Sequence, residues 1–425
     1  MTGQRGVDGL AGFVDCAAVT HGWTAIERVT GAALRAGIVA VAVISAGSAL
    51  AACQGPPVDA TAVRDDEVAH HAGQLDERVA EGAFTFGQYC ALCHGADATG
   101  YVADHAPSLV SPTFLESVSD DQLARGIREG RPGTAMAGYA RSRGGPLDDD
   151  SVAAIIAFLR DQGPAHVRLP TAPVLGDAAG GEVVWAASCQ RCHGTHTERG
   201  SAVHLGNASF LSGASDAFLR HAVVHGRPGT PMPAFDGALG EPQIDDVVAM
   251  LRAWATPPAP ERRAPPEPPP LGQVVINPGG KTPDFTLRAD RFVPIDDVKR
   301  ALDAKMRLVI IDARPASDWY VMHIPGSISV PYYMLTRLDA MPKDKDSTWI
   351  TAYCACPHHA SGTVVDELRK RGFTHTAILD EGILEWKKRG YPTASEPEEG
   401  AAPKTPPPRT PVSAAKALVS GTMKR

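Results

Sequence analysis

The stretch Cys90-Ala-Leu-Cys93-His94 occurs again, with the same spacing, as Cys189-Gln-Arg-Cys192-His193. In both copies two thiols lie three residues apart, and a histidine directly follows the second thiol. Near a helix end, this spacing brings both thiols within reach of one flat ligand, and the histidine then points toward its centre. The two pentapeptides therefore predict two copies of one ligand-binding module.

The residues before each pentapeptide repeat as well. A glycine and an aromatic residue stand eight and four positions before the first cysteine, as Gly82 and Phe86 in one copy and Gly181 and Trp185 in the other. In a helix, the aromatic residue would share a face with that cysteine. Repetition at a fixed offset is typical of a duplicated domain.

A third repeated element follows each pentapeptide. The sequence Gly-Arg-Pro-Gly-Thr-x-Met covers residues 130–136 and 226–232, and amphipathic patterns predict helices over 151–161 and 246–255. The order helix, C-x-x-C-H, loop, methionine, helix resembles the class I cytochromes c. C-x-x-C-H is the attachment motif of c-type haem. The resemblance implies two all-α cytochrome c domains, at residues 76–163 and 177–256.

The resemblance also implies a set of ligands for two covalently bound haem c groups. The cysteines carry the haem, while a histidine and a loop methionine hold the iron, a pair that raises the haem potential and suits electron transfer. The implied residues are Cys90, Cys93, His94 and Met136 for one haem, and Cys189, Cys192, His193 and Met232 for the other. Two alternatives stay open. The methionines could fill gaps in a core, or the iron could be open or take a second histidine from His105, His204, His221 and His225.

Members of this family usually place a proline carbonyl against the ring of the iron-binding histidine. Pro107 is suited to this role in the first copy, whereas His204-Leu205 stands there in the second. The partner of His193 therefore stays open.

After the second module the pattern changes to alternating strands and helices. Apolar runs predict buried parallel strands at 308–312, 349–353 and 376–379, and helical patterns cover 295–305, 361–371 and 382–389. The stretches Asp312-Ala-Arg314, 323–331, Tyr353-Cys354 and 379–392 resemble a single rhodanese domain. The resemblance implies an α/β domain with a parallel sheet over residues 290–394.

In rhodaneses the cysteine after the central strand carries a persulfide, and the next helix N-terminus stabilises the anion. Cys354 takes that position, and Cys356 is the candidate resolving thiol. Their loop, with His358 and His359, contains no Arg or Lys, and Pro357 removes one amide donor. We therefore expect persulfide or polysulfide handling with slow thiosulfate turnover. A domain kept only for binding and a metal cluster of both cysteines and both histidines are the alternatives.

The N-terminal region predicts export. Residues 36–52 are apolar or small, follow Arg28 and Arg35, and contain no acid, which is the form of a signal peptide. The segment ends at Leu50-Ala-Ala-Cys53, which resembles the lipobox of bacterial lipoproteins. Residues 1–53 would then be a leader, with Cys53 lipid-modified on the periplasmic side of a bacterial membrane. An uncleaved membrane helix is the alternative, and it also places the remaining chain outside the cytoplasm.

Two further segments and the charge complete the expectations. Eight prolines between residues 257 and 270 predict an extended linker over 257–272 that separates rather than packs, and residues 395–425 are expected to be disordered. The net charge of -7 argues against a nucleic-acid partner. We expect an exported dihaem electron carrier with redox protein partners, whose third domain handles small sulfur compounds. The alternative is a haem-linked sulfurtransferase or sulfur-oxidising enzyme in which Cys354 is the catalytic persulfide carrier.

Overall fold

The computed structural model describes residues 65–257, 264–265, 267–343, 347–355 and 358–396. The predicted leader with Cys53, the thiol Cys356 and most of the predicted tail lie outside these residues. The described residues belong to one compact unit. None of their helices combines the length and apolar character needed to cross a bilayer.

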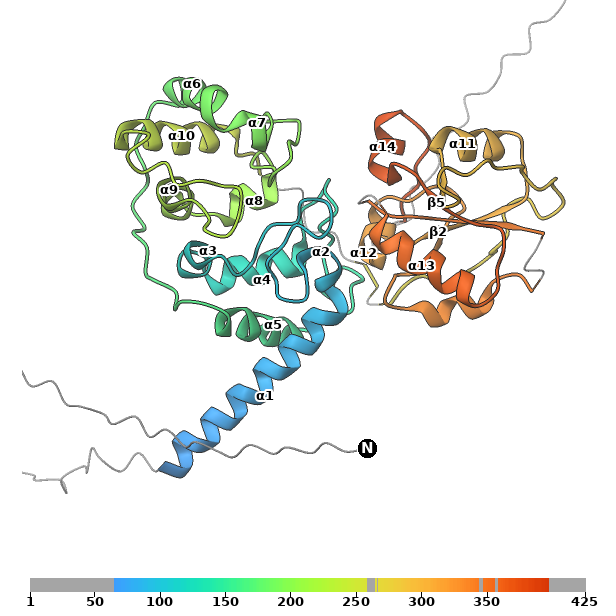
Figure 1. Cartoon of the computed structure of the whole chain (residues 1–425), viewed down its shortest axis with the longest axis horizontal. Helices are drawn as coiled ribbons and strands as arrows, with labels where there is room; N and C mark the ends of the chain where they lie inside the picture. Colours follow the sequence, from blue (N-terminus) through green and yellow to red (C-terminus); the bar gives the residue numbers. More distant parts are fainter. Residues whose placement is uncertain (1–64, 258–263, 266, 344–346, 356–357, 397–425) are drawn as a thin grey trace, which may run out of the picture. The chain divides into compact units, whose positions relative to one another are not determined.

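The two predicted modules are helical and share one order of elements (Figure 1). The first consists of α1 (Asp65–Tyr89), α2 (Ala91–His94), α3 (Pro112–Ser117), α4 (Asp120–Glu129) and α5 (Asp149–Asp161). The second consists of α6 (Ala178–Ser188), α7 (Gln190–His193), α8 (Ala208–Gly213), α9 (Asp216–His225) and α10 (Glu241–Trp254). The duplication predicted from the sequence is therefore confirmed.

Helix α10 begins five residues before its predicted start at Asp246. Pro242 lies in its first turn, where a missing N–H costs nothing. The Gln243 side chain accepts a hydrogen bond from the Gly240 N–H at 2.9 Å, which satisfies a donor at the helix start. These capping contacts extend the helix beyond its apolar pattern.

The first and last helices of each module pack together through aromatic side chains. The ring centroids of Phe86 and Phe158 lie 5.2 Å apart in the first module, and those of Trp185 and Trp254 lie 4.9 Å apart in the second. The aromatic residue four positions before each first cysteine therefore belongs to the core, and it fixes the helix from which the attachment segment emerges.

The third domain has a five-stranded sheet whose paired strands are all parallel, in the order β1-β5-β4-β2-β3. This confirms the predicted fold class. The strands are β1 (Phe292–Val293), β2 (Leu308–Asp312), β3 (Ile328–Ser329), β4 (Trp349–Tyr353) and β5 (Thr376–Leu379). The helices are α11 (Ile295–Asp303), α12 (Ala316–Val321), the 3-10 helix η1 (Leu335–Ala340), α13 (His359–Lys370) and α14 (Gly382–Lys388).

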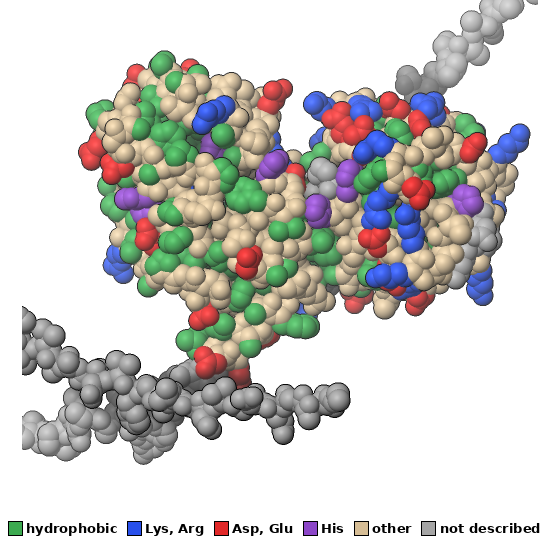
Figure 2. Space-filling view, in the orientation of Figure 1, with side chains coloured by type: hydrophobic (Ala, Val, Ile, Leu, Met, Phe, Trp, Pro, Cys, Tyr) green, Lys and Arg blue, Asp and Glu red, His purple; other side chains and the backbone are tan. Residues whose placement is uncertain are grey.

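Both faces of the sheet are covered, which explains the continuous apolar runs of its strands. Along β2, Val309 and Ile311 belong to the cluster that includes residues of α13, while Leu308 and Ile310 belong to the cluster that includes residues of α11 and α14. Figure 1 shows α13 on one side of the sheet and α11 and α14 on the other. The helices that cover the sheet leave its carboxyl edge to the loops after β2, β4 and β5. Acidic and basic side chains are interspersed on the face of this domain seen in Figure 2.

The described part of the proline-rich linker corrects the expectation that it separates the domains without packing. Ala264 is buried against Trp319 and Tyr320 of α12, and its N–H donates to the Ser142 carbonyl at 3.0 Å. The Tyr320 hydroxyl donates to the Glu267 carbonyl at 2.9 Å. An extended proline-rich backbone has carbonyls without internal partners, so it can accept such donors.

Candidate functional site

Each C-x-x-C-H segment continues the helix that precedes it by one further turn. The Cys90 N–H donates to the Phe86 carbonyl at 2.8 Å, and the His94 N–H donates to the Cys90 carbonyl at 3.0 Å. The same bonds in the second copy measure 2.9 Å and 3.0 Å. None of the four cysteines of these segments forms a disulfide. One helical turn thus carries two thiols and one imidazole in each module.

A backbone carbonyl orients the imidazole in both modules. His94 Nδ1 lies 2.9 Å from the Pro107 carbonyl oxygen, and His193 Nδ1 lies 2.8 Å from that of Val203. A carbonyl oxygen can only accept, so Nδ1 carries the proton and Nε2 keeps the lone pair that a metal requires. Burial lowers the pKa of both histidines, which favours the neutral, ligating form.

The proline contact predicted for the first copy is confirmed. The second copy uses the carbonyl of Val203 in place of a proline. Because the contact needs only a backbone oxygen, the side chain at that position is free to vary, and the sequence alone did not reveal it.

Met136 and Met232 end two turns of the same construction. In each, the N–H of the arginine in the Gly-Arg-Pro-Gly segment donates to the methionine carbonyl, at 2.7 Å and 3.1 Å. A threonine hydroxyl accepts from each methionine N–H, at 3.1 Å and 3.2 Å. Both methionines are partly buried and lie outside the helices. They therefore occupy structured loops, which agrees better with a ligand than with core filling.

The alternative histidines have other partners. His204 Nε2 lies 3.2 Å from the Thr195 carbonyl, and His221 Nε2 lies 3.1 Å from a Glu116 carboxylate oxygen. The His225 ring packs on His221 with centroids 4.4 Å apart, and His105 has a left-handed backbone with φ 51°. Paired thiols, a neutral imidazole and a thioether in each module fit haem c, whereas these four histidines are engaged elsewhere or lie in a turn.

Cys354 lies directly after β4 and is 2% exposed. Its Sγ is 3.3 Å from the Ser361 hydroxyl oxygen, in the first turn of α13. The structure thus places the predicted thiol at a helix N-terminus, where the helix dipole and a hydroxyl donor favour a thiolate.

His358, one of the two histidines of this loop, faces an acidic side chain. Its Nε2 lies 2.8 Å from a carboxylate oxygen of Asp380. The Asp380 carboxylate also accepts charge-assisted hydrogen bonds from Arg288 at 2.7–3.0 Å. The ring of His358 packs on Phe292 with centroids 4.2 Å apart. Sequence reasoning missed Arg288 and Asp380, because neither stands in the cysteine loop. Within the described residues, no group of three or more His, Cys, Asp and Glu side chains is arranged to hold a metal.

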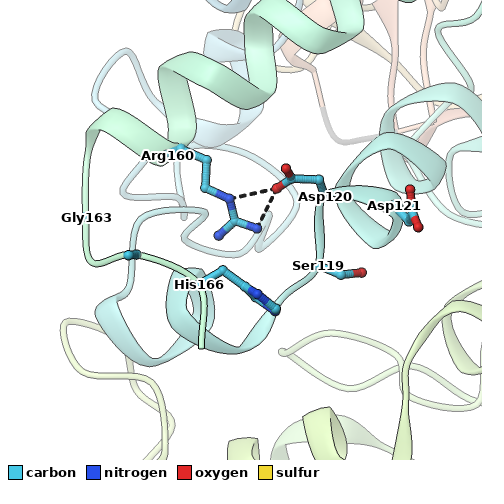
Figure 3. Close-up of a pocket in the computed structure, with 7 residues that line it drawn as sticks. Ser119, Asp120, Asp121, Arg160, Gly163 and His166 are labelled. Carbon is cyan, nitrogen blue, oxygen red and sulfur yellow. Dashed lines mark hydrogen bonds and ion pairs between the residues drawn. The ribbon is translucent and has the colours of Figure 1, made fainter. Parts of the chain in front are cut away.

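An open pocket in the first module contains none of the predicted site residues (Figure 3). Arg160 crosses it and pairs with Asp120 at 2.8 Å, and its two terminal nitrogens donate to the carbonyls of Leu115 and Val118. Arg252 makes the corresponding bonds in the second module. Because the same arginine network connects the helices in both modules, we interpret it as structural and do not assign a ligand to this pocket.

Comparison with known families assigns all three domains. Residues 77–159 and 176–251 match the family model of the cbb3-type cytochrome c oxidase subunit III, and residues 295–389 match the rhodanese-like domain. The cbb3-type cytochrome c oxidase subunit FixP of Bradyrhizobium sp. is 31% identical over 168 residues, which are 38% of this chain and 55% of that protein. The subunit CcoP of Azospirillum sp. is 28% identical over 205 residues, 44% of this chain and 65% of that protein.

Solved structures give a further likeness. The rhodanese-like domain of the Alr3790 protein from Anabaena sp. is 25% identical with a TM-score of 0.22, and the match covers 31% of this chain and 92% of that one. Among the curated relatives named above, the chain spans between about half and two thirds of their length.

Proposed function

We propose that this chain, which joins two cytochrome domains of the cbb3-type subunit III family to one rhodanese-like domain, carries electrons through two covalently bound haem c groups. The observation that supports this function best is the paired orientation of His94 and His193. Each has its Nδ1 bonded to a backbone carbonyl, directly after two thiols. We propose Met136 and Met232 as the second iron ligands.

The haem would supply an iron that gains and loses one electron with little change in its ligands. The chain contributes three things. Cys90, Cys93, Cys189 and Cys192 would anchor the ring through thioether bonds. The carbonyls that accept from Nδ1 hold the imidazoles in one tautomer and orientation. Buried aromatic side chains beside each attachment turn keep the sites apolar, which limits the reorganisation of water during electron transfer.

The methionine assignment is tested by the weak long-wavelength sulfur-to-iron band of the oxidised protein. Met136→Ala and Met232→Ala should each remove about half of that band, because each haem would contribute one thioether. Met250, which is 1% exposed in the core of the second module, provides the control, and Met250→Leu should leave the band unchanged. A full band in both loop variants would exclude these methionines as ligands.

We also propose export and a lipid anchor at Cys53, so that the domains work on the periplasmic side of a membrane with donor and acceptor proteins as partners. Covalent haem attachment follows export in c-type cytochromes, so the predicted leader and the C-x-x-C-H segments support each other. Cys53→Ser should release soluble protein that still carries haem. Retention in the membrane would favour the uncleaved helix instead.

A second function is favoured by the position of Cys354 beside Ser361. The Cys354 thiolate would attack the terminal sulfur of a polysulfide. One S–S bond of the donor breaks, the shortened polysulfide leaves as an anion, and Cys354 keeps the transferred sulfur as a persulfide, without net oxidation. As resolving thiol, Cys356 would attack the Cys354 sulfur as a thiolate, releasing hydrosulfide and forming a disulfide. Mass mapping after polysulfide treatment should find the added sulfur on Cys354, with a longer lifetime in Cys356→Ser.

A further inference from the structure

The attachment segment of the first cytochrome module packs against the rhodanese-like domain. Leu92, within the first C-x-x-C-H, and Ala135, directly before Met136, pack against the buried cluster that contains Cys354. Ala135 also packs against the cluster that contains Ala355. Helix α2, which carries the first haem-binding histidine, contacts α13, the helix that follows the cysteine loop. The first C-x-x-C-H segment thus packs against the cluster that contains Cys354 and against the helix that follows it.

Four tyrosines close this contact, two from each domain, and we call them the tyrosine junction: Tyr89, Tyr139, Tyr332 and Tyr333. The Tyr332 hydroxyl donates to the Tyr89 carbonyl at 2.6 Å and lies 3.2 Å from the Tyr139 hydroxyl. The rings of Tyr89 and Tyr333 meet edge to face, with centroids 5.0 Å apart. Burial raises the pKa of all four, so they stay neutral hydrogen-bonding groups at physiological pH.

A further polar contact is buried in the same place. The Ser317 hydroxyl of α12 donates to the Gly138 carbonyl at 2.6 Å, and both residues are buried. Separating the two domains would remove this bond and those of Tyr332, and it would expose Leu92 and Ala135 to water. Such a contact combines apolar burial with satisfied polar groups, as a stable interface does.

The second module has no equivalent surface. The residue that corresponds to Leu92 is Arg191, and the one that corresponds to Ala135 is Pro231, and both are exposed. Ser188 and Phe235 stand where the first module has Tyr89 and Tyr139, so the second module lacks both tyrosines that the first module contributes to the junction. The second module therefore serves as a natural control for docking, since only the first module has the residues that contact the third domain.

We propose that the rhodanese-like domain is docked on the first haem site through the tyrosine junction, so that the sulfur state of Cys354 is sensed at that haem site and not at the second. This inference rests on the proposed haem sites. Where Cys354 is still a protonated thiol at rest, a persulfide anion on it places a negative charge at a buried position, in the cluster against which Ala135 packs. Charges act over longer distances in a buried, weakly polarisable surrounding. The added charge stabilises the oxidised form of a nearby iron site and lowers its reduction potential.

Docking itself is measured by amide hydrogen exchange of the full haem-loaded chain, which does not depend on activity. Peptides that contain α2 and residues 332–333 should be protected in the natural protein. Leu92→Arg, which installs the residue of the second copy, should raise exchange in both, and Tyr332→Phe should do so to a smaller extent. Arg191→Leu is the matched control and should change neither. Fast exchange of residues 332–333 in the natural protein, or equal exchange in it and in Leu92→Arg, would overturn the docking.

Sensing is measured by redox titration before and after polysulfide treatment. The potential of one haem should fall in the natural protein, and that haem should be the one whose sulfur band is lost in Met136→Ala. The fall should be absent in Cys354→Ser and reduced in Leu92→Arg. A fall at the second haem, or at neither haem while Cys354 is shown by mass to carry sulfur, would refute the inference. Absence of haem from the purified protein would instead refute the proposed function. Hydrogen exchange of that haem-free chain would still show whether the two domains are docked.

Discussion

Gly82 of α1 lies so close to α5 that a Cβ at this position would overlap the carbonyl oxygen of Ala154. Gly181 of α6 approaches the Asp246 carbonyl of α10 in the same way. The glycine eight residues before each first cysteine is therefore the point at which the first and last helices cross. Only a residue without a side chain permits that approach, and the crossing fixes the helix that leads into the haem attachment turn.

Replacing either glycine by alanine should destabilise its module. The added methyl must push two helices apart, and overpacking of this kind costs about 1–3 kcal/mol. Gly87→Ala is the control on the same helix, because a Cβ there meets nothing within 4 Å. It should be neutral or stabilise the helix by up to about 1 kcal/mol. Urea unfolding, monitored through the loss of the sulfur-to-iron band, measures the stability of each variant. If Gly82→Ala is as stable as Gly87→Ala, the close helix crossing at Gly82 does not limit the size of the side chain there.

The arginine networks beneath α3 and α8 lead to a second prediction. Arg160→Ala would leave the carbonyls of Leu115 and Val118 without their donor, at a cost of about 1–3 kcal/mol in the free energy of unfolding. Arg128→Ala, which removes a pair with the exposed Asp149, should cost about 0–1 kcal/mol. Equal losses in the two variants, measured by urea unfolding, would show that the network adds no more than a surface ion pair.

Most elements of the fold could be predicted because their signals are local. The strands at 308–312, 349–353 and 376–379 have the predicted bounds, since buried parallel strands form continuous apolar runs. Strands β1 and β3 have two residues each, which is too short for any periodic pattern. The C-x-x-C-H segments could be identified from the sequence because two thioether bonds to one haem require two cysteines at this spacing.

What could not be predicted depends on contacts between segments far apart in the chain. Nothing in the sequence near Tyr89 indicates that its carbonyl accepts from Tyr332, 243 residues later. The same holds for Val203, whose carbonyl serves His193 although its side chain gives no sign of it. The linker was expected to separate the domains because proline content reports backbone shape and not the partners of that backbone, as Ala264 shows.

The ion pair between Arg314 and Asp312 leads to a third prediction. Arg314 donates to both carboxylate oxygens, at 2.9 Å and 2.6 Å, and Asp312 has no exposed surface. Arg314→Ala leaves a buried, unpaired carboxylate and should lower the free energy of unfolding of the rhodanese-like domain by about 3–5 kcal/mol. Asp312→Ala combined with Arg314→Ala should cost less than the sum of the single changes. Additive losses in urea unfolding would indicate that the two groups do not interact.

His323 predicts how the stability of this domain depends on pH. Its ring is 4% exposed, stacks on Trp319 with centroids 3.9 Å apart, and has its Nδ1 2.8 Å from the Trp319 carbonyl. Burial lowers its pKa. Below the unfolded-state pKa of about 6.5, the unfolded chain takes up a proton that the folded domain resists. The contribution of His323 to the free energy of unfolding should therefore be fully present above that value, and it should decline as the pH falls toward the lowered pKa of the folded domain.

The measurement for His323 is the urea midpoint at about pH 7.5 and about pH 5.5. His323→Asn should reduce the difference between the two midpoints. His375→Asn serves as control, because its ring is only partly buried and meets Trp349 edge-on at 5.0 Å. An unchanged difference in His323→Asn would mean that another group causes the acid sensitivity.

The last prediction concerns the hydroxyl beside the proposed persulfide carrier. The Ser361 Oγ lies 3.3 Å from Cys354 Sγ, so it can donate to a thiolate and hold more of the thiol in its reactive form. One such bond contributes about 0.5–1.5 kcal/mol. Ser361→Ala should therefore slow alkylation of Cys354 by about two- to tenfold at neutral pH. Thr363→Ser, two residues further along the same helix with its hydroxyl bonded to the His359 carbonyl, should leave the rate unchanged. An equal rate in Ser361→Ala and the natural protein would mean that the helix terminus alone, and not the hydroxyl, sets the reactivity of Cys354.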